Sequence, residues 1–230
     1  MFWYGFDYYY LVLIVPAIII SFIAQAKVTS TFSKYNRIAN ARGLTGSEVA
    51  RRILDMNGLT NVVIEHVKGN LTDHYDPKSK ILRLSDSVFS SRSVAALGVA
   101  AHECGHAIQH AKGYSPLKIR NSVFPLVSFS SGAAVPIIIL GFIFNTPFLI
   151  DAGIILFSAV VFFQLVTLPV EFNASSRALK ILEDSYFLEG TETKSARKVL
   201  SAAALTYVAS ALMSVMQLLR FIILANNRRD

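Results

Sequence analysis

The stretch that organises this chain is Val123–Val170, with the sequence VFPLVSFSSGAAVPIIILGFIFNTPFLIDAGIILFSAVVFFQLVTLPV. Two apolar runs, 123–144 and 148–170, are separated here by only Asn145, Thr146 and Pro147. Each run has about 20 residues, which at a rise of ~1.5 Å per residue is enough to cross a hydrocarbon core of ~30 Å. Because the link is so short, the two helices must run antiparallel. The stretch therefore predicts a transmembrane helical hairpin.

The composition of the whole chain also indicates a membrane protein. Hydrophobic residues make up 53% of the 230 residues, charged residues only 16%, and the mean hydropathy is +0.47. A soluble domain carries roughly 25% charged residues and a disordered chain is poor in apolar residues, so neither class fits. The single cysteine, Cys104, excludes an internal disulfide and a multi-cysteine metal cluster. The net charge of +7 is typical of cytoplasmic loops rather than of a nucleic-acid surface, and we expect no nucleic-acid partner.

A first apolar run, Leu11–Ala26, predicts a further spanning helix. Aromatic side chains favour the headgroup layer, and the residues before this run form such a belt: they are Phe2, Trp3, Tyr4, Tyr8, Tyr9 and Tyr10. A secretory signal peptide is the alternative, because Ala24-Gln25-Ala26 resembles a cleavage site. The region before the run has no Lys or Arg and contains Asp7, whereas a signal peptide begins with basic residues. We therefore favour an uncleaved anchor over residues 1–26.

Charge predicts the orientation of the chain in the membrane. Basic residues lie just after the first run and none before it, which places the N-terminus outside and residues 27–121 in the cytoplasm. The hairpin at 123–170 then returns residues 171–230 to the cytoplasmic side. The last apolar run, Val199–Ala225, is ambiguous because Arg220 lies inside it and a charge within the apolar layer is costly. We favour three spans and a fourth hydrophobic helix that packs against them or lies at the interface.

The cytoplasmic segment has a mixed pattern. A capping box at Thr45–Glu48 opens an amphipathic helix that ends near Gly58. The runs Asn61–Val67 and Lys80–Leu84 have the composition and alternation of strands, which predicts a small antiparallel sheet. A further helix is expected from about Ser90 to Lys112. The fold class expected for residues 1–230 is a single, mainly α membrane protein with a small antiparallel β-sheet.

Chemistry is concentrated in that last helix, in the motif His102-Glu103-Cys104-Gly105-His106. Four helical residues turn the chain by ~400°, so the two histidines project from one face about 6 Å apart. Both imidazoles then reach one Zn²⁺ at ~2.0–2.1 Å, and Glu103 is placed to act as a general base on a metal-bound water. Cys104 points away from this face and is expected to pack. Gly105 suggests a close helix approach at the site.

A catalytic zinc usually has three protein ligands, so one more is needed. His110 lies eight residues beyond His102, ~12 Å along the helix axis, and is out of reach. Glu171 is the better candidate, since a carboxylate in an otherwise uncharged stretch at the end of the hairpin needs a partner. The alternative is an interfacial glutamate that reaches towards solvent. Asp73, His74 and Asp76 suit a polar turn better than a second metal site, and the polar Glu183, Glu189 and Glu192 suit a solvated surface.

Three segments together resemble a known family: DHYDPKSKILRLS (Asp73–Ser85), VAAHECGHAIQ (Val99–Gln109) and LPVEFNASSRAL (Leu168–Leu179). They are similar to the neutral zinc metallopeptidases of bacterial membrane proteins, the YugP type, over nearly the whole chain. The resemblance implies a zincin-like, membrane-embedded endopeptidase with His102, His106 and Glu171 as zinc ligands and Glu103 as the base. A more distant similarity is to the HtpX and CAAX prenyl protease clan. There an Asp usually lies four residues after the third ligand, where this chain has Ser175.

The sequence thus predicts a multi-pass protein of the bacterial cell membrane, with a zinc-dependent peptidase site on its cytoplasmic side. The expected partners are the lipid bilayer and a membrane-associated protein or peptide substrate, which by analogy binds by strand addition at Lys80–Leu84. A non-catalytic, metal-binding membrane scaffold is the alternative, although such a protein has no need of Glu103. A transporter is disfavoured because the three expected spans carry no paired charges at mid-membrane.

Overall fold

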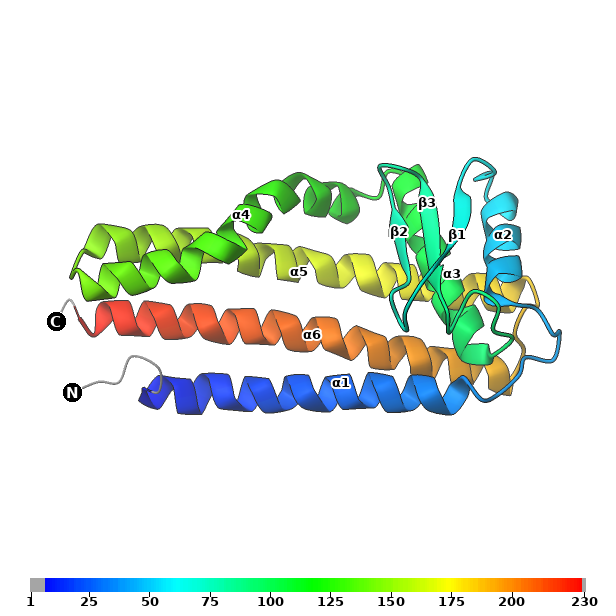
Figure 1. Cartoon of the computed structure of the whole chain (residues 1–230), viewed down its shortest axis with the longest axis horizontal. Coiled ribbons are helices and arrows are strands. Elements are labelled where there is room, and N and C mark those ends of the chain that lie inside the picture. Colours follow the sequence, from blue (N-terminus) through cyan, green and yellow to red (C-terminus); the bar gives the residue numbers. More distant parts are fainter. Residues whose placement is uncertain (1–6, 229–230) are drawn as a thin grey trace. The chain divides into compact units, whose positions relative to one another are not determined.

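The computed structural model describes residues 7–228 (Figure 1). Its elements are, in chain order, a short π-helical segment η1 (Tyr10–Ile14), α1 (Val15–Tyr35), α2 (Gly46–Met56), β1 (Val63–Val67), β2 (His74–Asp76), β3 (Ile81–Ser85), α3 (Val94–Ala111), α4 (Ser115–Ile143), α5 (Pro147–Asp184) and α6 (Thr191–Asn226). They form two compact units. An all-helical unit contains residues up to 25, 118–169 and from 206 onward, and a sheet-containing unit contains residues 26–117 and 170–205.

The all-helical unit contains the predicted hairpin. Helices α4 and α5 are separated by three residues, and Asn145 among them has the left-handed φ of +52° that ends a helix. The two helices pack closely, since a Cβ at Gly153 of α5 would lie 3.0 Å from the carbonyl oxygen of Ala134 in α4. The helical hairpin expected from the short link is therefore confirmed. Phe2, Trp3 and Tyr4, expected in the aromatic belt, lie outside the described residues.

Helix α6 contains the last apolar run, for which we expected a helix that packs against the spans or lies at the interface. In the described part of the chain, four helical segments are long and apolar enough to cross a membrane, and α6 is one of them. Arg220 no longer opposes a crossing, because its Nη2 donates to Asp7 Oδ2 at 2.6 Å and its charge is compensated. Asn227 also donates to the Tyr9 hydroxyl at 3.0 Å. The end of α6 thus lies at the beginning of α1, as in an antiparallel pair of spans.

The sheet of the sheet-containing unit is mixed rather than antiparallel. Its strand order is β1–β3–β2, with β3 parallel to β1 and antiparallel to β2. The sequence did not indicate β2, because His74–Asp76 is short and polar and resembles a turn. Because the chain forms the edge strand β2 between β1 and β3, it reverses direction twice before β3. Strand β3 therefore runs in the direction of β1 and lies between β1 and β2. The segment Lys80–Leu84, at which a substrate strand was expected to add as at a sheet edge, therefore lies in the central strand from Ile81 onward.

Helices α2 and α3 form the core of this unit together with the sheet. The predicted capping box is present: Thr45 Oγ1 accepts from Glu48 N at 3.2 Å and Glu48 Oε2 accepts from Thr45 N at 2.8 Å. Leu82 and Leu84 alternate along β3 onto one face and are fully buried with residues of both helices and of α5. Helix α3 begins after Ser93, whose Oγ accepts from Ala96 N at 3.0 Å. The motif helix thus packs against the sheet and α2 in one buried core.

Candidate metal centre

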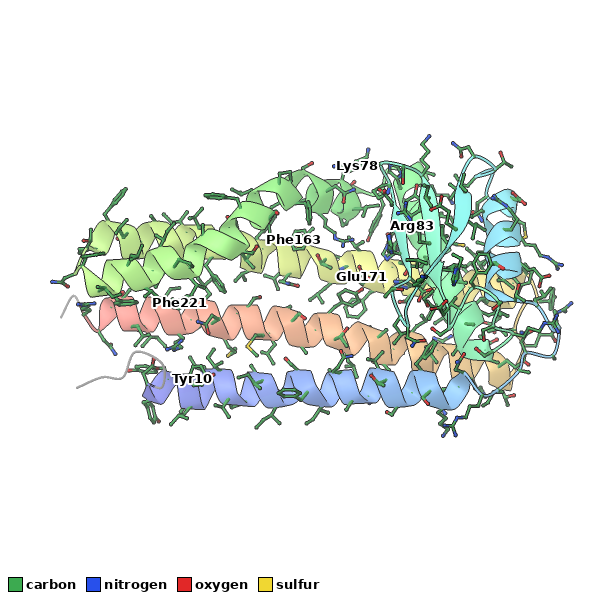
Figure 2. All side chains as sticks on the ribbon, in the orientation of Figure 1. Tyr10, Lys78, Arg83, Phe163, Glu171 and Phe221 are labelled. Carbon is green, nitrogen blue, oxygen red and sulfur yellow. The ribbon has the colours of Figure 1, made fainter. Side chains whose placement is uncertain are left out.

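Two helix faces form the site, one from α3 and one from α5 (Figure 2 labels Glu171 on α5). On α3 the residues are His102, Gly105, His106 and Gln109, and on α5 they are Glu171, Ala174, Ser175 and Ala178. Both sets have the spacing i, i+3, i+4 and i+7, which lies on one side of an α-helix. Gly105 lets the helices approach closely, because a Cβ there would lie 2.8 Å from the carbonyl oxygen of Ala174. The close approach expected at Gly105 is confirmed.

The three expected ligands meet at this contact. The Nε2 atoms of His102 and His106 lie 3.1 Å apart, and Glu171 Oε2 lies 3.3 Å and 3.5 Å from them. Ligand atoms at ~2.0–2.1 Å from a tetrahedral zinc ion are separated from one another by ~3.3–3.4 Å. The triangle formed by the three atoms therefore has the size that a zinc ion requires. It is the one group of three or more potential metal-ligating residues within residues 7–228.

The protonation of His106 also fits a cation at the centre of this triangle. Gln109 donates its amide hydrogens to Val170 O at 2.8 Å and Asn173 Oδ1 at 3.0 Å, so its Oε1 faces His106 Nδ1 at 3.0 Å. His106 Nδ1 must therefore carry the hydrogen, and its Nε2 lone pair points to the triangle. Three electron-rich atoms converge there, and a positive charge is needed to hold them together.

The raised pKa of His106 also indicates that the site stabilises positive charge. Burial opposes the imidazolium form, but the hydrogen bond to Glu171 and the negative charges of Glu103 and Glu171 raise the pKa of His106 above its usual range. A divalent cation is stabilised by the same carboxylates. The donor set, its spacing and its charge thus all fit Zn²⁺, and His102, His106 and Glu171 are the residues that would hold it.

Ser175 occupies the position at which the distant resemblance led us to expect an Asp. Its Oγ lies 3.1 Å from His102 Nδ1, the ring nitrogen that faces away from Glu171. A hydroxyl accepts a hydrogen bond as a carboxylate does, although without the charge. The contact that orients His102 is therefore present despite the substitution.

Gln109 and Asn173 are functional candidates that the sequence analysis did not identify. Gln109 is fully buried and joins His106 to α5, and Asn173 Oδ1 also accepts from Arg177 Nε at 2.7 Å. Arg177 is thereby connected to His106 through Asn173 and Gln109. The spacing could have identified Gln109, because it follows His106 by three residues and therefore lies on the same helix face.

The other polar residues considered from the sequence lie away from the triangle. His110 Nδ1 pairs with the Tyr75 hydroxyl at 3.0 Å. Asp73 accepts from Ser85 N at 2.7 Å and from Ser85 Oγ at 2.9 Å, and burial raises the pKa of its carboxyl despite these bonds. Glu189 pairs with Arg42 at the surface, and Glu192 caps Ala41 N. Cys104 is fully buried and faces Ala50, as expected for a packing residue.

The sequence matches known proteins over most of its length. A family model described as "Putative neutral zinc metallopeptidase" matches residues 10–226. A protein of Bacillus subtilis (strain 168), named "Putative membrane protease YugP", is 52% identical over 221 residues, which cover 96% of this chain and 98% of the relative. No solved structure matches. Together with the His–His–Glu triangle, these matches show that the chain belongs to the neutral zinc metallopeptidase family of membrane proteins.

Proposed function

We propose that this protein is a zinc-dependent endopeptidase that hydrolyses peptide bonds of membrane or membrane-adjacent proteins. His102, His106 and Glu171 hold the zinc ion, and Glu103 is the general base. The observation that carries the proposal is the triangle of Nε2, Nε2 and Oε2 atoms with separations of 3.1, 3.3 and 3.5 Å. It would supply three protein ligands to a zinc ion, which is the usual number at a catalytic zinc site.

A bound zinc ion would act as a Lewis acid and would lower the pKa of a water molecule bound to it to ~7. Glu103 follows His102 on α3 and is 8% exposed, so its carboxylate is shielded from bulk water. It accepts a proton from the attacking water, holds it at its carboxylate oxygen and donates it to the leaving amine. Gln109 and Ser175 keep the two imidazoles in the orientation that the ligand positions require.

An extended substrate is proposed to bind along β2 rather than along the central strand β3. Strand β2 is an edge of the sheet and contacts α3, to which Tyr75 is joined through His110. A peptide that adds to such an edge satisfies its backbone hydrogen bonds and lies extended beside the motif helix. This placement keeps the strand-addition mode inferred by analogy and changes only the strand.

We place the sheet-containing unit on the cytoplasmic side, where the basic residues that follow the first span predict it. Because Glu171 lies on the same helix as an apolar spanning segment, substrates are expected to be membrane proteins or chains close to the bilayer. Two substrates with one cleavage sequence, with and without a membrane anchor, test this preference. Equal cleavage of both by the protein in liposomes would contradict it.

Metal analysis combined with a cleavage assay tests the central proposal. The purified wild type is expected to contain zinc in equimolar amount, and to lose cleavage with a chelator and regain it with added zinc. His106→Ala and Glu171→Ala should lose both zinc and cleavage. The matched controls are His66→Ala, an exposed histidine on β1 that pairs with Asp86, and Glu183→Ala, an exposed carboxylate on α5, which should retain both.

Each outcome of this experiment has a distinct meaning. Zinc retained by Glu171→Ala would contradict the third ligand. Zinc bound by the wild type without cleavage of any membrane-anchored or soluble peptide would support a non-catalytic metal-binding scaffold instead of a peptidase.

A further inference from the structure

A groove in the all-helical unit has an apolar wall and a polar end. It lies between α4, α6 and the residues just before η1, and its volume is about 700 Å³. Sites that bind small molecules have volumes of ~300–1,000 Å³. Ile138 and Phe221 are buried in the wall, whereas Ile139 is 49% exposed at its rim. The apolar side chains come from two helices: Val135, Ile138, Ile139 and Phe142 from α4, and Phe221 and Leu224 from α6.

Hydrogen bonds hold three polar side chains at one end of this groove. Asn227 Nδ2 donates to the Tyr9 hydroxyl at 3.0 Å, so the hydroxyl can donate its own hydrogen to a further acceptor. Arg228 Nη1 donates to Phe142 O at 2.6 Å, and the guanidinium carbon lies 5.5 Å from the centre of the Phe142 ring. Because Phe142 lines the groove, these contacts hold the guanidinium against its wall. Within residues 7–228, the remaining N–H groups of Arg228 have no acceptor.

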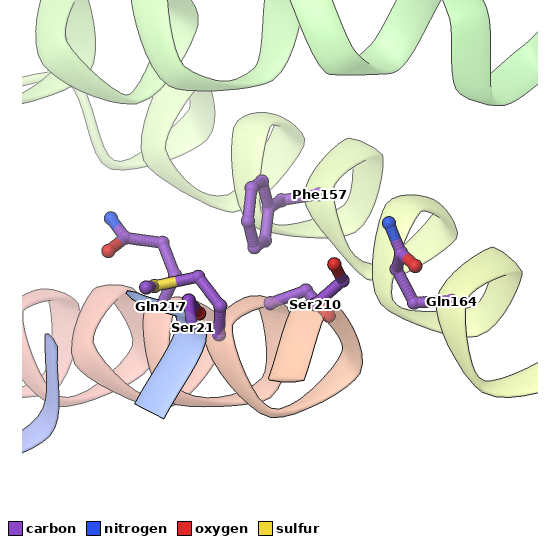
Figure 3. A pocket seen from close by; sticks show the side chains of 7 residues that line it. Ser21, Phe157, Gln164, Ser210 and Gln217 are labelled. Atoms are coloured by element: carbon purple, nitrogen blue, oxygen red, sulfur yellow. The ribbon is translucent and has the colours of Figure 1, made fainter. Parts of the chain in front are cut away.

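The charges that line the groove do not cancel. Asp7 and Arg220 form an ion pair and neutralise each other. Arg228 is exposed, and within the described part of the chain it forms no ion pair. A smaller depression of about 350 Å³ in the same unit, to which Gln164 and Ser210 contribute, has no charged residue in its lining (Figure 3). The groove therefore attracts an anion, whereas the depression offers no cation.

The polar end of the groove lies where the spanning segments end. Tyr10 begins η1, Ile143 ends α4 and Asn226 ends α6, and each adjoins a residue of the polar end. Lipid headgroups lie at this level of a membrane. Val135 precedes Ile143 by eight residues, or ~12 Å of helix, and the hydrocarbon of one leaflet is ~15 Å thick. The apolar wall therefore extends along most of one leaflet.

We propose that this groove binds one anionic phospholipid. Its phosphate accepts hydrogen bonds from Arg228 and from the Tyr9 hydroxyl, and an acyl chain lies along the apolar wall. A guanidinium group matches the geometry of a phosphate, and basic pockets between spanning helices are suited to anionic headgroups.

An amphipathic anion is the occupant that matches both parts of the groove. A free phosphate ion would leave the apolar wall uncovered, and an uncharged helix of a partner would leave the charge of Arg228 uncompensated. The inference concerns the all-helical unit alone and does not depend on the proposed peptidase activity.

Native mass spectrometry of the delipidated full-length protein in detergent tests the headgroup contact. The probes are phosphatidylglycerol and phosphatidylcholine with identical acyl chains. The first phosphatidylglycerol should bind roughly five-fold more tightly, which corresponds to about 1 kcal/mol for one basic residue beside an anionic lipid. Arg228→Gln should abolish this preference and Arg228→Lys should keep most of it. Arg197→Gln, which removes an exposed arginine of α6 outside the groove, should leave the preference unchanged.

A second variant tests the apolar wall. Ile139→Trp adds volume at the exposed rim, where a larger side chain need not disturb the core, and should weaken binding of both lipids at least three-fold. Ile155→Trp, at an exposed position of α5 outside the groove, is the matched control and should bind both lipids as the wild type does.

Four outcomes would overturn the proposal. Equal affinity of the wild type for both lipids, or a preference that survives Arg228→Gln, would show that Arg228 does not bind a headgroup. Glycerol phosphate that competes as well as phosphatidylglycerol would show a site for a free anion. Dimers that form without lipid and dissociate in Ile139→Trp would identify a second copy of this chain as the occupant. Because none of these measurements requires zinc or cleavage, their failure is distinguishable from failure of the proposed function.

Discussion

At the scale of single residues, Glu103 separates catalysis from metal binding. It adjoins the ligand His102 but is not one of the three residues whose donor atoms converge. Glu103→Gln keeps the size of the side chain and removes its ability to take up a proton. We expect unchanged zinc content and a loss of cleavage of at least ~100-fold, the usual contribution of a general base. Metal analysis and a peptide assay check both, with Glu183→Gln as a control, and full activity of Glu103→Gln would disprove the mechanism.

Ser175 is a second residue with a separable role, because its only assigned task is to orient His102 through the 3.1 Å contact. Ser175→Ala should weaken zinc affinity by ~10–100-fold, as is usual when the partner of a ligand histidine is removed. Ser175→Asp, which introduces a carboxylate that can also accept a hydrogen bond from His102 Nδ1, should retain wild-type affinity. Competition with a fluorescent chelator measures these affinities. Ser176→Ala, at the exposed neighbouring position, is the control, and equal affinities for all variants would show that the contact has no orienting role.

At the scale of elements, the site depends on how closely α3 and α5 approach. The Cβ of Gly105→Ala would lie 2.8 Å from Ala174 O, which is backbone and has little freedom to move. The helices must separate, so we expect a lower zinc affinity and a destabilisation of ~1–3 kcal/mol.

Gly98 in the same helix provides a matched control for this prediction. A Cβ at Gly98 would meet Ala196 Cβ at 3.5 Å, an ordinary contact, while the gain in helix propensity is the same. Gly98→Ala should therefore keep zinc affinity and be neutral or stabilising by up to ~1 kcal/mol. Zinc titration with thermal unfolding of both variants is the measurement, and Gly105→Ala with the affinity of the wild type would refute the close-contact interpretation.

At the scale of the whole molecule, the Asp7–Arg220 pair joins the first and last described helical segments within the all-helical unit. The side chain of Asp7 is 11% exposed and that of Arg220 is 10% exposed. The Arg220 guanidinium donates two hydrogen bonds to one oxygen of the Asp7 carboxylate. Loss of one partner leaves the other charge buried, so Asp7→Asn or Arg220→Gln alone should destabilise the fold by ~3 kcal/mol.

The double variant Asp7→Asn/Arg220→Gln should recover most of this loss, because neither charge remains. The exposed pair Arg42–Glu189, with side chains 49% and 62% exposed, is the control. Removing Arg42 should cost less than ~1 kcal/mol. Unfolding in detergent gives these values, and single variants as stable as the wild type would mean that the pair does not hold the two segments together.

The features that could be predicted depend on residues close together in the sequence, and those that could not depend on contacts between distant segments. The helical hairpin, the capping box at Thr45 and the common face of His102 and His106 follow from spacings of a few residues, and the structure has all three. The antiparallel sheet and the edge position of Lys80–Leu84 were wrong, because strand order depends on pairings between segments that propensity does not specify. The partner of Arg220 could not be predicted either, because Asp7 is 213 residues away in the sequence.

By itself the sequence determined the membrane class, the motif helix and the family, since apolar run length, helical periodicity and a short rigid motif are local properties. Tertiary structure alone decided where Glu171 meets the histidines, how Gln109 and Ser175 orient them, and which polar groups share a cavity between helices. These features arise from the approach of helices that are distant in sequence. Their geometry is set by side-chain volume at positions such as Gly105, which no one-dimensional pattern measures.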